Sequence, residues 1–169
     1  MTDRLRAVFC DHLSLIRGKY LPPSKIGTSN TNFCRSTYGV HFDKDLLPSP
    51  GSMMMEGLPD MELRWNANDI RDSWQDGTKV VIGDLYGMDG TPLPMCGRGA
   101  LKRAVAAWVE DGLTPMIGIE LEAFAFQKDE SGNLVPYDAP GAMVYGTGPG
   151  TDPLGFNDAI WEAAEKLGF

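Results

Sequence analysis

The alternation of apolar and polar residues at the start of the chain predicts a β-hairpin. Residues 5–10 and 15–21 are mainly apolar and short enough to be strands. The polar run 11–14 between them is typical of a turn, and Pro22-Pro23 ends the second strand because proline cannot donate to a sheet.

Further along, the pattern predicts two more strands and the loops between them. Residues 79–86 are rich in Val, Ile and Leu and form a convincing strand, followed by turn residues at 87–90. Residues 38–42 are expected to be another strand. The small polar residues 27–32 indicate a loop or the cap of a short helix.

A different periodicity follows in the C-terminal part. An Ala-rich helix is expected from residue 99, with Asp111-Gly112 at its end. A strand is expected over 116–126, a turn over 129–132, and a second helix over about 153–167. The first helix carries its apolar face on Leu101, Val105, Trp108 and Val109.

The change of composition near residue 95 indicates a domain boundary. We therefore expect an α+β protein with one domain over residues 1–94 and a second over 95–169.

The strand predicted over 116–126 carries the most informative side chains. Successive side chains of a strand point to opposite faces, so Glu120 and Glu122 share one face, about 6.6 Å apart along the strand. Two such charges are costly together unless a cation lies between them or one is protonated. Carboxylate oxygens suit Mg²⁺ or Mn²⁺. The alternative is an edge strand with two solvated glutamates, but the neighbouring Phe residues and the low strand propensity of Glu favour a metal site.

Charge and cysteine content restrict the partners. The chain has 15 Lys and Arg against 23 Asp and Glu, a formal net charge of -8, which argues against nucleic acid and anionic membrane surfaces. Three widely spaced cysteines indicate a reducing compartment, and no apolar run approaches 18 residues. We therefore expect a cytoplasmic protein with neither a nucleic-acid nor a membrane partner.

The run Gly118-Ile-Glu120-Leu-Glu122-Ala-Phe124-Ala-Phe126 resembles the metal-binding strand of glutamine synthetases. The order of other motifs agrees with that family: Asp11…Arg17-Gly18-Lys19 near the start, then Gly57-Leu58-Pro59-Asp60, then Gly90-Thr-Pro92 and Arg98. The resemblance covers the whole chain but only the front part of the family's length, nearest the glutamine synthetase-like and γ-glutamylpolyamine synthetase branch. It implies an N-terminal β-grasp domain followed by the start of the catalytic α/β domain.

The resemblance also implies roles for single residues. Glu122 would bind the metal that orders glutamate, and Glu120 would help to hold the metal at the nucleotide phosphates. Tyr145 matches a tyrosine that lines the ammonium site. Asp43 matches the β-grasp aspartate that deprotonates ammonium in a neighbouring subunit, and Asp45 is its rival.

The implied reaction is an ATP-dependent amidation of glutamate by ammonia through γ-glutamyl phosphate, with Mg²⁺ or Mn²⁺ as cofactor. The implied assembly is a homo-oligomer with active sites between subunits. A polyamine or another primary amine is an alternative acceptor, and a non-catalytic β-grasp interaction module is an alternative of another class.

Two strong metal ligands are fewer than the three that a catalytic metal usually has. The resemblance implies that the remaining metal ligands and the ATP-binding and glutamate-binding residues lie beyond residue 169. We therefore expect an N-terminal fragment that is inactive by itself.

Overall fold

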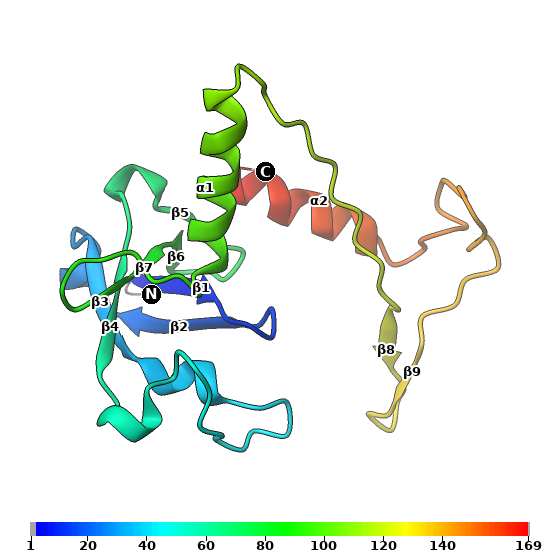
Figure 1. The fold of residues 1–169 in the computed structure, drawn as a ribbon. Helices are drawn as coiled ribbons and strands as arrows, with labels where there is room; N and C mark the ends of the chain where they lie inside the picture. The colour runs from blue at the N-terminus through cyan, green and yellow to red at the C-terminus, as the bar shows by residue number, and fades with distance from the viewer. Residues whose placement is uncertain (1–2, 169) are drawn as a thin grey trace. The chain divides into compact units, whose positions relative to one another are not determined.

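The computed structural model describes residues 3–168, which divide into two compact units (Figure 1). Unit 1 comprises residues 1–115 and unit 2 residues 116–169. The chain contains both sheets and helices, as the expected α+β class requires. The compact units divide after Pro115, so the first helix belongs to unit 1. The expected domains 1–94 and 95–169, and the β-grasp assignment, stay predictions.

The first sheet of unit 1 is built on the predicted hairpin. Strand β1 (Arg4–Cys10) pairs antiparallel with β2 (Ile16–Leu21), so the hairpin prediction is confirmed. On its other edge β1 pairs in parallel with β6 (Thr78–Ile82), and the short β5 (Arg71–Asp72) completes the order β2-β1-β6-β5.

A second, three-stranded sheet has the order β3-β4-β7, with β3 (Asn30–Cys34), β4 (Asp60–Arg64) and β7 (Asp84–Gly87) all antiparallel. The single strand predicted over 79–86 is therefore wrong, since it is divided between two sheets at Gly83. A Cβ atom at Gly83 would lie 2.6 Å from the carbonyl oxygen of Arg64, so only glycine fits this close approach.

Two other local predictions in unit 1 are wrong. The small polar residues 27–32 are predicted to be a loop or the cap of a short helix, but β3 begins at Asn30 because its partner β4 satisfies its backbone groups. Residues 38–42 are not a strand: a 3₁₀ helix spans Arg35–Gly39, and beyond it only Val40 forms a bridge, to Leu46.

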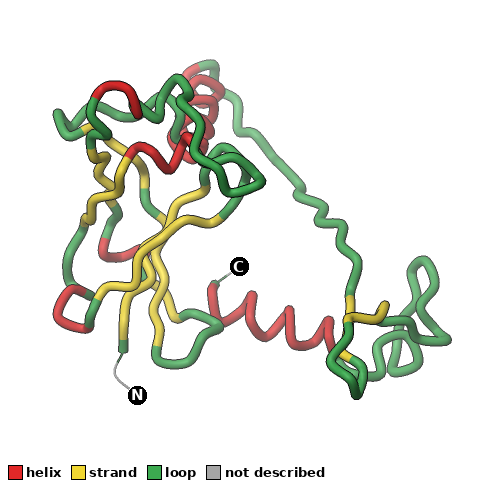
Figure 2. The backbone as a smooth tube through the Cα atoms, turned by 90° about the horizontal axis from the view of Figure 1, so that it is seen from below, coloured by secondary structure: helices red, strands yellow, loops and turns green. Residues whose placement is uncertain are grey.

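One apolar core joins the two sheets of unit 1, whose strands lie together in Figure 2. β1 contributes Leu5, Ala7 and Phe9, and Phe9 meets Phe33 of β3 edge to face, with ring centroids 5.1 Å apart. The other sheet strands contribute Met61, Leu63, Val81 and Leu85. Buried and less buried residues alternate along β4, as the pleat of a half-buried sheet requires, whereas in the middle of β1 Ala7, Val8 and Phe9 are all buried.

The helix α1 (Gly97–Glu110) confirms the prediction of a helix from about residue 99. It ends as expected, because Gly112 adopts a left-handed φ of 75°. Arg98 and Lys102 both contact the carboxylate of Asp84, with Arg98 Nε 3.1 Å from Oδ1, and so fasten the helix to β7.

Unit 2 contains a short hairpin and one helix. β8 (Phe126–Lys128) and β9 (Leu134–Pro136) are antiparallel around the predicted turn at 129–132, and α2 (Phe156–Leu167) confirms the second predicted helix. Within residues 3–168, the structure contains no helix with the length and apolar character needed to cross a membrane.

Candidate functional site

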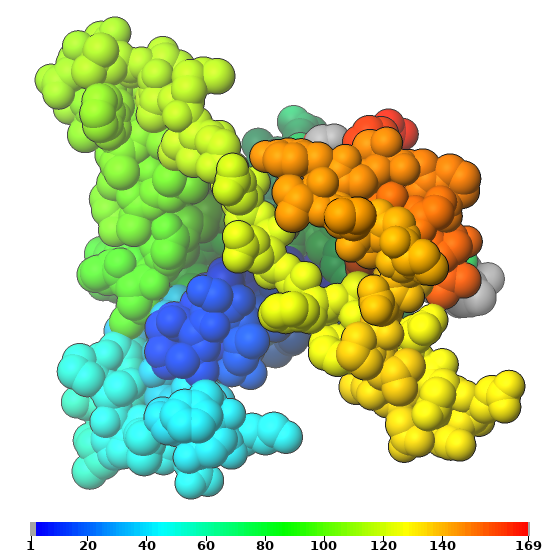
Figure 3. Space-filling view, turned by 90° about the vertical axis from the view of Figure 1, so that its right-hand side faces the viewer, coloured from blue at the N-terminus to red at the C-terminus, as the bar shows by residue number. Residues whose placement is uncertain are grey.

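Glu120 and Glu122 lie in an extended segment between α1 and β8. The strand predicted over 116–126 is wrong for this chain, because only Phe126 belongs to a strand. No amide of residues 116–125 donates a backbone hydrogen bond within the described chain, and the segment forms a narrow band of atoms in Figure 3. A strand needs a neighbour for its N–H and C=O groups. The described residues provide no such neighbour, so both glutamates are exposed.

The chemistry of this pair fits part of a metal site. Two carboxylates supply the oxygen ligands that Mg²⁺ and Mn²⁺ prefer. In the part of the chain that the structure describes, no three His, Cys, Asp or Glu side chains come together as a metal-ligand cluster. The assignment of Glu120 and Glu122 as metal ligands therefore stays a prediction.

Tyr145 lies in a glycine-rich loop of unit 2. The amide of Gly141 donates to the carbonyl of Gly150 at 3.1 Å, and Thr151 Oγ1 donates to the carbonyl of Gly141 at 3.0 Å, so the base of the loop is closed. Tyr145 adopts a left-handed φ of 57°, and its side chain is 98% exposed. A positive φ is strained for a tyrosine, so the loop holds the phenol in solvent at an energetic cost.

The loop leads into α2 through Asp152, a residue that the sequence reasoning missed. Tyr137 donates its hydroxyl hydrogen to Asp152 Oδ1 at 2.6 Å, and the amides of Phe156 and Asn157 donate to the two carboxylate oxygens at 3.0 and 2.6 Å. The hydrogen bonds from Tyr137 and Asn157 hold the pKa of Asp152 below its ordinary value. An aspartate shortly before a predicted helix is a sequence signal for such a cap.

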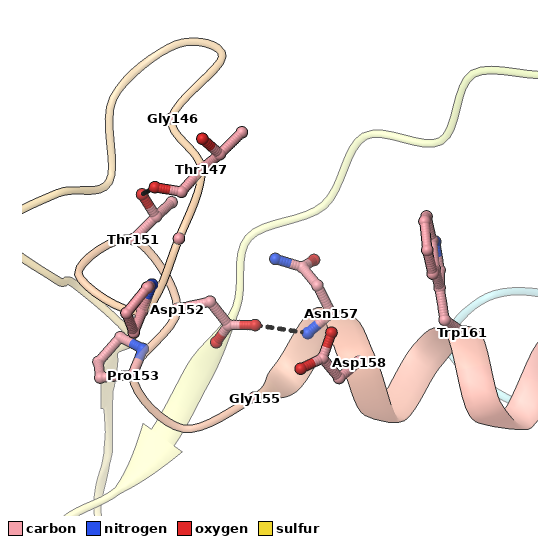
Figure 4. Close-up of a pocket in the computed structure, with 11 residues that line it drawn as sticks. Gly146, Thr147, Thr151, Asp152, Pro153, Gly155, Asn157, Asp158 and Trp161 are labelled. Atoms are coloured by element: carbon pink, nitrogen blue, oxygen red, sulfur yellow. Dashed lines mark hydrogen bonds between the residues drawn. The ribbon is translucent and has the colours of Figure 1, made fainter.

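A polar hollow lies between this loop and the first turns of α2 (Figure 4). Its volume is about 690 Å³. Its side chains include Thr147, Thr151, Asp152, Asn157, Asp158 and Trp161. In Figure 4 the carboxylate of Asp152 points toward the start of α2, where the dashed line marks its bond to the amide of Asn157. The acidic side chains make the hollow unsuited to an anion.

Asp43 lies in a tight turn of unit 1 that the bridge between Val40 and Leu46 closes. The amide of His41 donates to the carbonyl of Asp45 at 2.8 Å, and Lys44 adopts a φ of 75°. The amide of Asp45 donates to Asp43 Oδ1 at 3.0 Å. This bond, with a smaller contribution from His41, holds the pKa of Asp43 below its ordinary value. The side chain of Asp45 is exposed and makes no described hydrogen bond or ion pair.

The four predicted site residues are not brought together within one unit. Asp43 belongs to unit 1, whereas Glu120, Glu122 and Tyr145 belong to unit 2. Among the described residues, no hydrogen bond or ion pair joins any two of these four side chains. Their shared role therefore stays a prediction.

Comparison with known proteins identifies relatives of one kind. No family model matches the chain. The chain is 28% identical over 127 residues to type-1 glutamine synthetase 2 of Dictyostelium discoideum, covering 71% of this chain and 24% of the relative. It is 30% identical over 133 residues to a glutamine synthetase of Methanosarcina mazei, covering 76% and 28%. A shorter match, 41% identical over 49 residues, is to γ-glutamylanilide synthase of an Acinetobacter species, covering 29% and 10%.

Solved structures match the fold. A glutamine synthase homologue superimposes with a TM-score of 0.66 at 18% identity, covering 99% of this chain and 39% of that one. A GmaS/ADP complex does so with a TM-score of 0.56 at 16% identity, covering 99% and 37%. The chain thus spans about a quarter of the length of the curated glutamine synthetases it matches. The sequence matches, over 71% and 76% of this chain, identify it as a relative of the glutamine synthetases, of whose length it spans a part.

Proposed function

We propose that this chain is the N-terminal part of an ATP-dependent ligase that amidates glutamate with ammonia through γ-glutamyl phosphate. The alignment with glutamine synthetases over about three quarters of the chain carries this proposal. ATP, glutamate and ammonia are its proposed substrates, and a homo-oligomer with active sites between subunits is its proposed assembly.

In this proposal Glu120 and Glu122 are metal ligands, and further ligands come from residues outside this chain. A divalent metal would neutralise charge on the phosphoryl group during transfer. The exposure of both glutamates, with no described partner, supports the proposal, because a ligand must be available to complete a shared site.

Asp43 is the preferred acid for the ammonium site, and two observations support it over Asp45. The Asp43 carboxylate is fixed by the amide of Asp45, and this bond holds its pKa below the ordinary value, so its charged form is stabilised and oriented to accept a hydrogen bond from a cation. The side chain of Asp45 lacks such support. Tyr145, held in solvent by its loop, is the second proposed residue at that site.

A second candidate is a γ-glutamyl amine ligase that uses a primary amine in place of ammonia. The local match to γ-glutamylanilide synthase favours it. A non-catalytic interaction module is the candidate of another class, and the closed core of unit 1 favours a part that folds by itself.

The test begins with the reading frame of the source DNA downstream of the codon for Phe169. Expressed from it, the longer protein is assayed for glutamate-dependent release of phosphate from ATP with Mg²⁺ and, in parallel, ammonium, putrescine or aniline. We expect ammonium to be the preferred acceptor; a preference for putrescine or aniline would select the amine ligase instead.

The matched variants are Glu122→Ala and Glu130→Ala, the second removing an exposed carboxylate from the β8–β9 turn. We expect Glu122→Ala to lower the rate about 100-fold or more, because a metal ligand is lost, and Glu130→Ala to leave it unchanged. A stop codon after Phe169, with a stable product whose unfolding ignores Mg²⁺ and Mn²⁺, would favour the non-catalytic module.

A further inference from the structure

His41 stands beside the proposed ammonium-site acid on the same tight turn. Its Nδ1 atom lies 3.0 Å from Asp43 Oδ1, without an aligned hydrogen bond in this conformation. Its ring also contacts the ring of Phe42, with centroids 4.1 Å apart. The backbone of the turn is fixed by the bond from the His41 amide to Asp45 and by that from Lys44 to His41, at 2.8 and 3.0 Å. The backbone bonds of the turn and the contact with the Phe42 ring therefore keep the imidazole next to the carboxylate.

The two oxygens of Asp43 have different surroundings. Oδ1 meets both the amide of Asp45 and Nδ1 of His41, each at 3.0 Å. Among residues 3–168, no described hydrogen bond or ion pair engages Oδ2. A carboxylate whose one oxygen is anchored presents the other in a fixed direction, which lowers the entropy lost when a ligand binds.

We propose that His41 is a positioning residue, which holds Oδ1 of Asp43 through its Nδ1–H group and leaves Oδ2 to accept a hydrogen bond from the ammonium or primary ammonium substrate. This inference rests on the proposed function for the role of Asp43, but the contact itself does not. His41 does not touch the substrate. It sets the direction of the group that does.

The other charged side chains of the turn do not replace this contact. Lys44 and Asp45 are both exposed, and neither side chain has a described ion pair with Asp43. The chain has one other histidine, His12, which stacks on Tyr38 with ring centroids 5.7 Å apart. With only two imidazoles in the chain, His12 serves as an internal control for each measurement on His41.

The first test is NMR spectroscopy of this 169-residue chain. Long-range ¹H–¹⁵N spectra of its two imidazoles report which nitrogen carries the proton, and the Asp43 carboxyl carbon reports the pKa of that group. We expect neutral His41 to carry its proton on Nδ1, because a carboxylate faces that nitrogen. His12 should show the usual Nε2–H form.

Three variants distinguish the effect of the Nδ1–H donor of His41 from the effect of its ring. His41→Phe keeps a ring and removes the donor, and the pKa of Asp43 should then rise toward its ordinary value. His41→Asn places an amide N–H where Nδ1 was and should keep the pKa low, and His12→Phe should leave it unchanged. Amide shifts of β1 and β6 confirm that each variant is folded. An Asp43 titration that is identical in wild type and His41→Phe would overturn the contact.

The second test measures kinetics in the longer ligase. We expect His41→Phe to raise KM for ammonium about tenfold, because the charged Asp43 carboxylate loses one hydrogen bond. KM for glutamate and ATP should stay constant. His41→Asn should restore the wild-type KM. If Asp43→Asn abolishes activity while His41→Phe equals wild type, the role of His41 is refuted and the proposed function stands. If Asp43→Asn is fully active, the proposed role of Asp43 fails, and with it the function assigned to His41.

Discussion

The two units treat their apolar residues differently. In unit 1, Leu5, Met61 and Leu63 are fully buried in a core that both sheets share. In unit 2, Ala139 is the only hydrophobic residue buried within the described part, while Leu121 and Phe124 are 90% and 93% exposed. Both units contain hydrogen-bonded elements, so the contrast lies in packing and not in local structure.

This contrast distinguishes local structure, formed between neighbours in the chain, from the packing of an apolar core. A hairpin turn or a helix cap needs only neighbours along the chain, and unit 2 has both, at Asp129 and Asp152. A core needs a second layer of structure, which unit 1 supplies with its second sheet. The apolar residues of segment 116–125 have no such layer among the described residues, so the energy of burying them is not gained in this chain.

The largest expected difference is in hydrogen exchange. Amides of β1 should exchange only through unfolding of unit 1, whereas amides of 116–125 donate no described backbone hydrogen bond and should exchange almost freely. For a domain stability of about 5 kcal/mol, protection should differ by roughly three to four orders of magnitude. Mass spectrometry or NMR after transfer to D₂O measures it, and equal protection of the two segments would contradict the contrast.

A smaller effect is expected from truncating one leucine in each unit. Leu63→Ala removes a side chain that is 0% exposed and should cost about 2–5 kcal/mol, since a cavity forms in a closed core. Leu121→Ala removes one that is 90% exposed and should change stability by less than about 0.5 kcal/mol. Urea unfolding followed by tryptophan fluorescence gives both values. A large loss in the Leu121 variant would mean that segment 116–125 is packed in solution.

The third comparison concerns two turn aspartates. Asp11 Oδ1 accepts from the amides of Leu13 and Leu15, each at 2.9 Å, while Oδ2 pairs with Arg17 Nε at 2.5 Å. Asp129 makes similar amide contacts in the β8–β9 turn, but it is exposed. Asp11→Asn should therefore cost about 2 kcal/mol, because a buried carboxylate loses the charge that pairs with Arg17 and accepts from two amides. Asp129→Asn should leave the urea midpoint of unit 1 unchanged.

The same pair predicts a dependence on pH. Burial opposes ionisation of Asp11, but the hydrogen bonds from Arg17, Leu15 and Leu13 outweigh it and lower its pKa. The contribution of Asp11 to the free energy of unfolding is therefore complete above its pKa in the unfolded chain, about 4. This contribution is lost as the pH falls through the lower pKa of the folded state. Urea titrations between pH 7 and pH 3 should show this loss in wild type and a weaker slope in Asp11→Asn. Equal slopes would refute the role of Asp11.

The smallest expected effect is local to α2. Asp152→Ala removes the acceptor of the Phe156 and Asn157 amides, so the first turn of α2 should fray while unit 1 keeps its stability. Since hydrogen bonds lower the pKa of Asp152, acid should fray wild type in the same way, but only below the ordinary aspartate pKa. Cα chemical shifts of residues 156–160 measure the fraying. Asp158→Ala is the control, and an effect as large as that of Asp152→Ala would contradict the cap.

Local patterns predicted the elements whose stability is local. The first hairpin, both helices and the 129–132 turn were found because turn residues, caps and periodicity lie close together in the chain. The division at Gly83 could not be seen, because it depends on how closely the backbone of Arg64 approaches. β3 was missed because its polar sequence becomes a strand only when β4 pairs with it.

The candidate site divides in the same way. The residue types at Glu120, Glu122, Asp43 and Tyr145 were visible as motifs. The support around them was not: the closed loop behind Tyr145 and the imidazole at Asp43 Oδ1 depend on contacts in space. The prediction of a strand over 116–126 is wrong because it used only the alternation of apolar and polar side chains. That alternation does not show whether a neighbouring strand is present to pair with.

By itself, the sequence indicated the resemblance to glutamine synthetases, the mixture of helices and strands and the positions of both helices, and it predicted Glu120 and Glu122 as metal ligands. Only the tertiary structure decided that two sheets share one core in unit 1, that the Val/Ile-rich run is divided between them, and that segment 116–125 stays unpaired among the described residues. The physical reason is that propensity and capping act between neighbours in the chain, whereas strand pairing and burial depend on partners that the order of residues does not name.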